Sequence, residues 1–360
     1  MRIVKNVKRS GFPKSNNGAR SFSRWVFVIV ACLSFSGCRS VDLGIVDVQT
    51  RALIKIPCSG GSKPQVMAVN DDASEFVTLI AQGEEAGLRV YGYDGQEKRF
   101  LFPKCLQKNS DIISSSGDGS KLVFRNPKNS NLYVYNTETD VETLVYSNIS
   151  SATQWDSIAG IAWLSKEKLL VLLNKDYKKE REHSVIEVVD ITSKERKVLF
   201  SPRYIHPFCN AYAISADKTK IAFCDGESND SVVRILEIET GKVLYSGKKG
   251  AYRNIQWLQT GIGIGYVSGG HKIDVVSLAD KTEYTLLTIS QKYTIMHLGF
   301  GKDFFAVDVW RFGERNDQIV VPMNIYDLKT REEVFTVRAD VRGNWFVADH
   351  GQKIICEIGY

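Results

Sequence analysis

The chain has 360 residues, 43% of them hydrophobic and 24% charged, which is typical of a folded protein with one large β domain or two ordinary domains. Its net charge of +6 comes from residues 1–37, which hold seven basic residues and no acidic residue. Of the 47 basic residues in the chain, 40 then remain against 41 acidic ones, so the charge balance excludes a general argument for nucleic-acid binding.

The first expected element is an export signal over residues 1–37. Its basic residues precede the apolar run Trp25–Phe35, which is shorter than the roughly 20 residues of a membrane span. The run is followed by the small residues Ser36 and Gly37, directly before Cys38. This order of basic, apolar and small residues predicts a secretory signal peptide.

The ending Ser36-Gly37-Cys38 resembles the lipobox of bacterial lipoproteins. The resemblance implies that Cys38 becomes the first mature residue and carries lipid, and that residues 38–42 form a short membrane tether. By the same resemblance, Arg39 after the cysteine implies a position at the outer membrane, facing the periplasm. An ordinary signal peptide and an uncleaved anchor are the alternatives.

From residue 43 onward the chain alternates between two kinds of predicted β-hairpin. The first kind has an alternating strand, a polar turn and a second strand, as in Gly44–Pro57. Its turns recur every 39 to 53 residues, at Thr50, Gly95, Asp140, Ser193, Gly241, Asp280 and Thr330. A different hairpin fills each gap, and its turn residues, such as Gly117-Asp118-Gly119, tolerate positive φ.

Four strands in each unit of about 45 residues predict the blades of a β-propeller. Seven inner hairpins are present, and the last, Asn344–Ile358, has no outer hairpin after it. Gly44–Pro57 has no inner hairpin before it, so these two would complete one blade and remove two unpaired sheet edges. We therefore expect an all-β, seven-bladed propeller over residues 43–360, with four antiparallel strands per blade and a closing blade shared by the N- and C-terminal segments.

The turns of the inner hairpins resemble those of a known family of propellers. The small-residue turn and following apolar strand are similar to the TolB-type repeat, a relative of the WD repeat. The residues that match are Ser116, Asp118, Gly119, Lys121 and, in part, Ser215, Asp217 and Lys220. The resemblance covers essentially all of residues 43–360 and implies the propeller fold, but it implies no activity.

The sequence lacks the patterns of common catalytic and metal sites. Its five histidines have no metal-ligand spacing, and it has no G-x-S-x-G nucleophile motif. We therefore predict a binding protein without catalytic residues, metal or cofactor. The alternative is an enzyme, a lyase or glycosidase that acts on an acidic saccharide in the axial funnel, where His206 and His297 are the histidines expected near the axis.

The links between blades are rich in basic and aromatic residues, and few of their residues are acidic. In a propeller they share one face with the loops between the second and third strands. A basic face with aromatic side chains suits an acidic protein segment, an anionic glycan or a lipid head group. The residues predicted to bind this ligand or partner are Trp155, Arg203, Tyr204, His206, Lys248, Lys249 and Arg253. Together these features favour a monomeric, lipid-anchored binding or scaffolding protein of the cell envelope.

Five cysteines follow Cys38, an odd number for an oxidising compartment. Cys209 and Cys224 lie on two strands that should pair, which makes them the candidate disulfide. Cys224 and Cys356 also occupy matching apolar strands, where a buried thiol would act as a small hydrophobic side chain. Trp163 and Trp257 occupy matching places at the ends of inner strands and are predicted to pack between blades.

Overall fold

The computed structural model describes most of the predicted propeller. The described residues are 41–56, 65–70, 74–82, 85–104, 106, 113–126, 131–147, 158–174, 184–205, 211–226, 228–312, 318–337, 340–348 and 351–359. All of them belong to the second of two compact units, Arg39–Tyr360. The predicted signal peptide lies outside the described residues, and the first strand begins at Val41, within the predicted tether.

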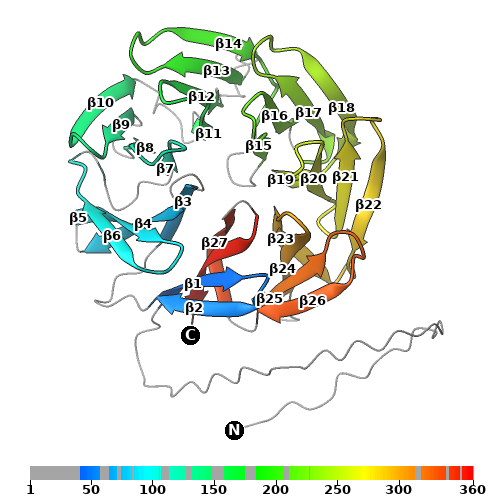
Figure 1. The fold of residues 1–360 in the computed structure, drawn as a ribbon. Coiled ribbons are helices and arrows are strands. Elements are labelled where there is room, and N and C mark those ends of the chain that lie inside the picture. The colour runs from blue at the N-terminus through cyan, green and yellow to red at the C-terminus, as the bar shows by residue number, and fades with distance from the viewer. Residues whose placement is uncertain are drawn as a thin grey trace, which may run out of the picture. The chain divides into compact units, whose positions relative to one another are not determined.

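The described strands form seven four-stranded antiparallel sheets around a common centre (Figure 1). Each sheet is one blade, and blades 1 to 6 follow one another along the chain. From the inside outward, blades 1 to 3 contain β3 (Gln65–Asn70), β4 (Glu75–Gln82), β5 (Glu85–Gly92) and β6 (Glu97–Leu101); β7 (Ile113–Ser115), β8 (Lys121–Arg125), β9 (Leu132–Asn136) and β10 (Val141–Tyr146); and β11 (Ile158–Trp163), β12 (Lys168–Leu173), β13 (Val185–Asp190) and β14 (Arg196–Phe200).

Blades 4 to 6 repeat this order. They contain β15 (Tyr212–Ile214), β16 (Lys220–Asp225), β17 (Ser231–Glu237) and β18 (Val243–Gly250); β19 (Tyr252–Trp257), β20 (Gly263–Ser268), β21 (Lys272–Ser277) and β22 (Glu283–Thr288); and β23 (Tyr293–Phe300), β24 (Phe304–Phe312), β25 (Gln318–Asp327) and β26 (Glu333–Val337). The seven four-stranded blades confirm the predicted all-β propeller.

Blade 7 joins the two ends of the propeller. Its order is β27 (Asp340–Ala348), β28 (Lys353–Gly359), β1 (Val41–Asp47) and β2 (Ala52–Ile56). In the antiparallel pairing of β1 with β28, Gly44 lies opposite Cys356 and Ile45 opposite Ile355. Ile45 is fully buried in a cluster that includes Phe76 of blade 1. The N-terminal hairpin thus supplies the two outer strands that the C-terminal hairpin lacks, as the repeat count predicts.

The turn between the two outer strands has a recurring conformation in all seven blades. One residue in each turn has a positive φ between 56° and 84°, namely Arg51, Gly95, Asp140, Lys194, Gly241, Lys281 and Arg331. An Asp or Asn often starts the turn, as Asp190 does by accepting the backbone N–H groups of Thr192 and Ser193 at 2.9 Å. At Gly241 packing also requires glycine, because a Cβ there would lie 2.4 Å from the Leu199 carbonyl oxygen.

Neighbouring blades are also joined at their outer strands. Between blades 2 and 3, the Arg196 guanidinium lies 3.7 Å from the centre of the Tyr146 ring. Between blades 3 and 4, the Lys197 Nζ donates a hydrogen bond to the Glu239 carbonyl oxygen at 2.9 Å. Contacts at the rim therefore add to the apolar packing between blades.

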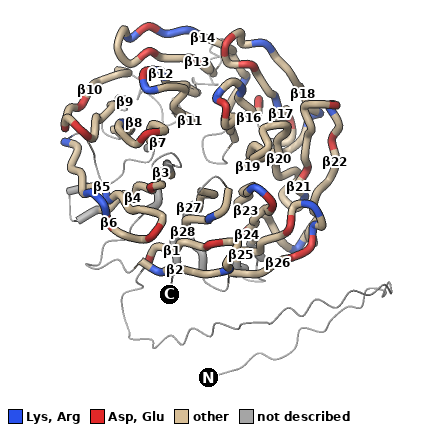
Figure 2. Tube along the Cα trace, viewed as in Figure 1, with Lys and Arg blue, Asp and Glu red and all other residues tan. Residues whose placement is uncertain are grey.

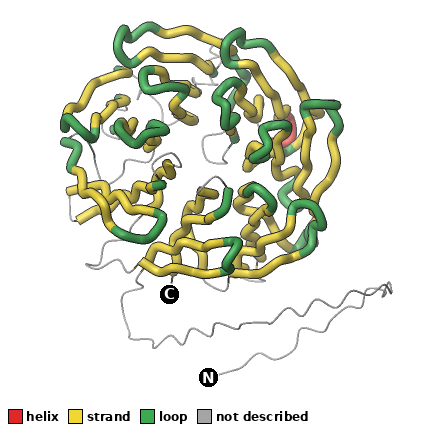
Figure 3. Tube along the Cα trace, in the orientation of Figure 1, coloured by secondary structure: helices red, strands yellow, loops and turns green. Residues whose placement is uncertain are grey.

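The two faces of the ring are built from different connections (Figure 3). The turn face carries the hairpin turns that follow the first and third strands of each blade. The link face carries the loops after the second strands and the links to the next blade. Within the described residues one short 3₁₀ helix occurs, η1 (Ser228–Asp230), in the loop between β16 and β17. No helix in this part of the chain is long and apolar enough to cross a bilayer.

Candidate functional site

The predicted binding residues that the structure describes belong to blades 4 and 5 or to the link before them. Arg203 and Tyr204 lie between β14 and β15, Lys248 and Lys249 lie near the end of β18, and Arg253 is the second residue of β19. The structure therefore gathers part of the predicted set on neighbouring blades. The other two members, Trp155 and His206, lie outside the described residues.

Lys248 and Lys249 are strand residues rather than link residues. The sequence suggests a link here, but β18 continues to Gly250, and only Ala251 separates it from β19. Both lysine side chains are exposed. Because β18 is the outermost strand of its blade, these side chains are open to solvent and accessible to a partner.

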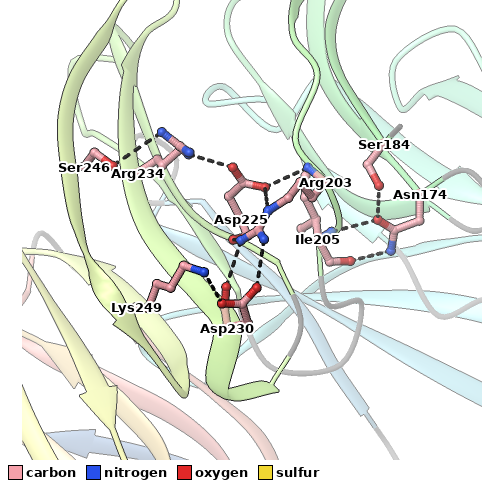
Figure 4. A network of polar contacts seen from close by, with 9 residues as sticks. All are labelled: Asn174, Ser184, Arg203, Ile205, Asp225, Asp230, Arg234, Ser246 and Lys249. Carbon is pink, nitrogen blue, oxygen red and sulfur yellow. Dashed lines mark hydrogen bonds and ion pairs between the residues drawn. The ribbon is translucent and has the colours of Figure 1, made fainter. Parts of the chain in front are cut away.

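A buried carboxylate organises the link between β14 and β15 (Figure 4). Asp225, at the end of β16, has a side chain that is only 4% exposed. It accepts hydrogen bonds from the Arg203 backbone N–H at 2.7 Å and from Arg234 Nε at 2.6 Å. A buried carboxylate needs such donors, and bonds to charged donors are the stronger ones. Asp225 therefore holds the link and the strand β17 together.

A second carboxylate, Asp230, lies at the surface of the same network. Arg203 Nη1 donates to its Oδ2 at 3.0 Å, and Lys249 Nζ lies 2.6 Å from its Oδ1. Arg203 Nη2 also donates to the backbone carbonyl of Asp230 at 2.8 Å. Lys249 and Arg203 together hold the pKa of the Asp230 carboxyl below its usual range. The guanidinium of Arg203 is thus fixed by several bonds, while its side chain stays 48% exposed.

The residues after Arg203 are fixed from the other side. Ile205 donates its backbone N–H to Asn174 Oδ1 at 3.0 Å, and Ser184 Oγ donates to the same oxygen at 2.9 Å. The Tyr204 carbonyl accepts the Gly226 N–H at 2.9 Å. Tyr204 is itself buried, so its ring supports the link instead of offering an open aromatic surface.

The prediction of a basic face did not include the acidic members of this network, because it rested on the charges of the links alone. Asp225 ends the second strand of blade 4 and Asp230 lies in the loop after it, on the same face as the links. Figure 2 shows acidic stretches beside basic ones around the ring. Counting both kinds of loop would have found the two aspartates. The network of Arg203, Arg234 and Lys249 then has one more positive than negative charge, and the exposed Lys248 adds another.

Arg253 lies beside the loop between β20 and β21. One of its guanidinium nitrogens is 3.1 Å from the position that a Cβ on Gly270 would take, and Gly270 has a φ of +79°. A side chain at position 270 would therefore press on the guanidinium. The same loop is tied to the next inner strand, because Ile295 donates its backbone N–H to the Gly270 carbonyl at 2.8 Å.

Of the histidines expected near the axis, His297 lies on the inner strand β23. Its Nδ1 is 2.9 Å from Asp308 Oδ2, and its backbone N–H donates to Asp308 Oδ1 at 2.6 Å. The Asp308 side chain is 3% exposed and that of His297 is 25% exposed. Among the residues the structure describes, no group of three or more His, Cys, Asp or Glu side chains could hold a metal ion.

The cysteines that the structure describes lie in the apolar core. Cys224 in β16 and Cys356 in β28 are both buried, as the apolar strand patterns predict. Cys209 lies outside the described residues, so its predicted disulfide with Cys224 stays a prediction. Trp163 and Trp257 are also buried, and each donates its indole N–H to the inner strand of the preceding blade, at Ser114 and Ala213.

Comparison with known proteins agrees with the fold. No known protein family and no curated protein matches the sequence. An oligogalacturonate lyase from Vibrio parahaemolyticus superposes with a TM-score of 0.60 at 11% identity, over 89% of this chain and 97% of the lyase. The propeller domain of Cps50 (Swd1) from Myceliophteria thermophila gives 0.56 at 12% identity, over 81% of this chain and 95% of that domain.

A TolB-type protein from Agrobacterium tumefaciens superposes with a TM-score of 0.52 at 11% identity, over 90% of this chain and 99% of that protein. The chain is thus similar in structure to TolB-like and WD-repeat propellers, in line with the resemblance of its turns. Identities this low establish a shared architecture and no shared activity.

Proposed function

We propose that this chain is a non-catalytic, membrane-anchored lipoprotein of the periplasm that binds a protein partner or an anionic ligand with its link face. The observation that carries the proposal is the network around Asp225 and Asp230, which fixes cationic side chains on one face of a rigid ring. Preorganised charged groups favour binding because fewer side-chain conformations are lost when the partner arrives. Complementary charge also speeds the encounter with an acidic partner.

Charge reversal on the link face tests this proposal. The double variant Lys248→Glu and Lys249→Glu should bind partners crosslinked in the native cell envelope more weakly, and the loss should be smaller at high salt because charge interactions are then screened. Its melting temperature should change little, because Lys249 and Asp230 are 67% and 57% exposed and such surface pairs contribute little to stability.

A matched control reverses two lysines on the turn face. Both are exposed: Lys242 follows Gly241 in the turn between the outer strands of blade 4, and Lys281 lies in the corresponding turn of blade 5. The variant Lys242→Glu and Lys281→Glu makes the same change in net charge and should leave binding intact. Equal losses in both variants would point to overall charge, and a loss in the control alone would move the site to the turn face.

The proposed anchor has its own test. Replacement of Cys38 by Ala should release soluble protein into the periplasm or leave an unprocessed precursor in the membrane. Mass spectrometry of the native N-terminal peptide should find lipid on Cys38. An unmodified Cys38, or cleavage at another residue, would remove the lipid anchor from the proposal and leave the binding face untouched.

A second candidate function is that of an enzyme acting on an acidic saccharide. One observation favours it, the pair of His297 and Asp308 on the inner strands of blade 6, because a histidine oriented by a buried carboxylate is suited to general acid–base catalysis. Incubation with oligogalacturonate, followed by the ultraviolet absorbance of an unsaturated product, tests it. Turnover that disappears in His297→Ala would establish this function in place of simple binding.

A further inference from the structure

Two phenylalanines of blade 1 lie exposed side by side at the rim of the propeller. Phe100, in the outer strand β6, is 40% exposed, and Phe102, just after this strand, is 57% exposed. Their ring centroids are 4.2 Å apart at an angle of 77°. Both rings pack on Gly87 of β5, where a Cβ would lie 2.8 Å from Phe100 and 3.2 Å from Phe102. The two rings are therefore held in place while a large part of each stays open to water.

Blade 1 differs from blades 2 and 3 at this position. The outer strands of the three blades end in a buried or half-buried residue, namely Leu101, Tyr146 and Phe200. The next residue is exposed in each blade, and it is Phe102 in blade 1 but Ser147 and Ser201 in blades 2 and 3. Single apolar side chains are scattered over any protein surface, whereas adjacent exposed aromatic rings mark a contact surface.

Cationic side chains lie beside the two rings. The Arg89 guanidinium is 5.4 Å from the centre of the Phe100 ring, and Lys104, two residues after Phe102, is exposed. Aromatic rings insert at the boundary between headgroups and acyl chains, and lysine or arginine beside them interacts with anionic headgroups. The composition of this surface therefore suits a lipid bilayer.

The path of the chain brings the proposed lipid anchor to the neighbouring blade. Val41 starts β1 opposite the end of β28, so the chain enters blade 7 at the link face. Cys38 lies three residues earlier, a distance of at most about 10 Å in extended chain. Blades 7 and 1 share an apolar cluster that contains Leu43 of β1 and Tyr91 of β5. Because Phe102 follows the link-face end of β6, it lies on the same face as Val41 in the adjacent blade.

We propose that Phe100 and Phe102 contact the surface of the lipid bilayer, with their rings at the level of the headgroups. The inference rests on the membrane anchor of the proposed function and adds the orientation of the propeller. Blade 4 lies three blades away from both blade 1 and blade 7 around the ring (Figure 1). The network around Asp225 is then on the side of the ring away from the membrane contact, where a partner has access to it.

Other occupants fit the two rings less well. A stable protein interface buries about 800 Å² on each partner, whereas one aromatic side chain contributes about 150–250 Å². Two phenylalanines are therefore too small a surface for a dimer of this chain. A sugar ring packs flat against an aromatic face, and rings at 77° to each other offer it no shared flat surface.

A tryptophan reporter tests the contact in the full chain. The protein is extracted from membranes and reconstituted into vesicles of phosphatidylethanolamine and phosphatidylglycerol, with or without bromine on the acyl chains. Each variant is compared with the wild type, because the chain already contains tryptophans. An interfacial side chain lies about 5–10 Å deep, so brominated lipid should reduce the added emission of Phe102→Trp about twofold. The matched control is Val198→Trp on the outer strand of blade 3, which is 55% exposed and should not be quenched.

Chemical labelling gives a second measurement. In the vesicles, Lys104 of the wild type should react more slowly with an amine reagent that does not cross membranes than it does in detergent. The double variant Phe100→Ser and Phe102→Ser should lose this protection. The control Tyr284→Ser removes an exposed ring, 43% exposed and 5.6 Å from the Arg331 guanidinium, from the outer strand of blade 5, and it should keep the protection.

The outcomes separate this contact from the rest of the proposed function. If the wild type floats with the vesicles but Phe102→Trp is not quenched, or Val198→Trp is quenched equally, the orientation is wrong while the anchor stands. If the wild type does not associate with vesicles, the anchor and the contact both fail. Protection of Lys104 that persists in detergent would mean that a second copy or another protein covers the rings. Loss of partner binding in detergent by the double serine variant would assign the rings to that partner and overturn the membrane contact.

Discussion

The turn face and the link face of this propeller differ in how regularly their connections repeat from blade to blade. On the turn face, every turn between outer strands has one residue with a positive φ, and the inner turns at Ser116 and Ser215 use the same serine–aspartate hydrogen bond. On the link face, the network around Asp225 belongs to blade 4 and its neighbours. The difference indicates that repeated turns build the ring, whereas unrepeated loops are available for recognition.

The largest effect should come from removing the hairpin that closes the ring. Deletion of residues 44–57 removes most of β1 and all of β2, which leaves β28 without its outer neighbour and takes Ile45 out of the core. An unpaired strand edge invites aggregation, and the apolar packing of blade 7 against blade 1 is lost. We expect aggregation or loss of a single cooperative transition, measured by calorimetry and light scattering.

This deletion tests whether the propeller is stable when blade 7 lacks its two outer strands. The control is deletion of residues 1–37 alone, because it shortens the chain and leaves every described strand in place. The closure argument fails if the hairpin deletion melts at the same temperature as this control with the same cooperativity.

The next effect concerns the link face. Asp225→Ala should lower the free energy of unfolding by roughly 3 kcal/mol, because it leaves the Arg203 N–H and the Arg234 guanidinium without the buried carboxylate that they share. Denaturant unfolding measures the loss. The matched variant Asp230→Ala removes a carboxylate from the same network at an exposed position and should change stability little.

This pair sharpens the contrast between a structural and a binding aspartate. If both variants unfold like the wild type, the network is not rigid, and the preorganised cations on which the proposed function depends are absent. If Asp230→Ala lowers the free energy of unfolding more than Asp225→Ala does, the exposed carboxylate contributes more to stability than the buried one. The argument from the burial of Asp225 is then incorrect.

The smallest effect should appear on the turn face at acid pH. The hydroxyl of Ser215, together with the backbone N–H of Thr219, holds the pKa of Asp217 well below the value of 3.8 that is usual for aspartate. Because the folded-state pKa is the lower one, the carboxylate stabilises the fold above about pH 4, and this contribution is lost as the pH falls through the folded-state pKa.

Asp217→Asn tests this sign directly. The variant should melt at a lower temperature than the wild type at pH 6. This difference should narrow as the pH falls below about 4, because the unfolded wild-type chain then binds a proton that the folded carboxylate, with its lower pKa, does not yet bind. Melting curves between pH 6 and pH 2 give the comparison. If the difference in melting temperature stays constant or grows as the pH falls, the charge of Asp217 does not contribute to the stability of the turn.

The sequence by itself determined the ring. Recurrence of two hairpin types, turn residues that tolerate positive φ and an unmatched hairpin at each end gave seven blades and the shared closing blade, because strand alternation and turn chemistry are local properties. Buried cysteines and the packing of Trp163 and Trp257 between blades follow from the same repeats. Strand boundaries beside the links were predicted less well. The strand β18 continues through the lysines at its end, and β27 begins at Asp340, four residues before the expected hairpin.

The tertiary structure alone decided which polar groups meet. Asp225 and Arg203 are 22 residues apart in sequence, and they join because the loop after one strand and the link before another share a face. His297 and Trp345 likewise lie on different blades. No local pattern marks such pairs, since their contact depends on how blades are stacked around the axis and on bulges that redirect individual side chains. For that reason the sequence predicted some of the basic residues of the network, whereas their acidic partners were identified only in the folded protein.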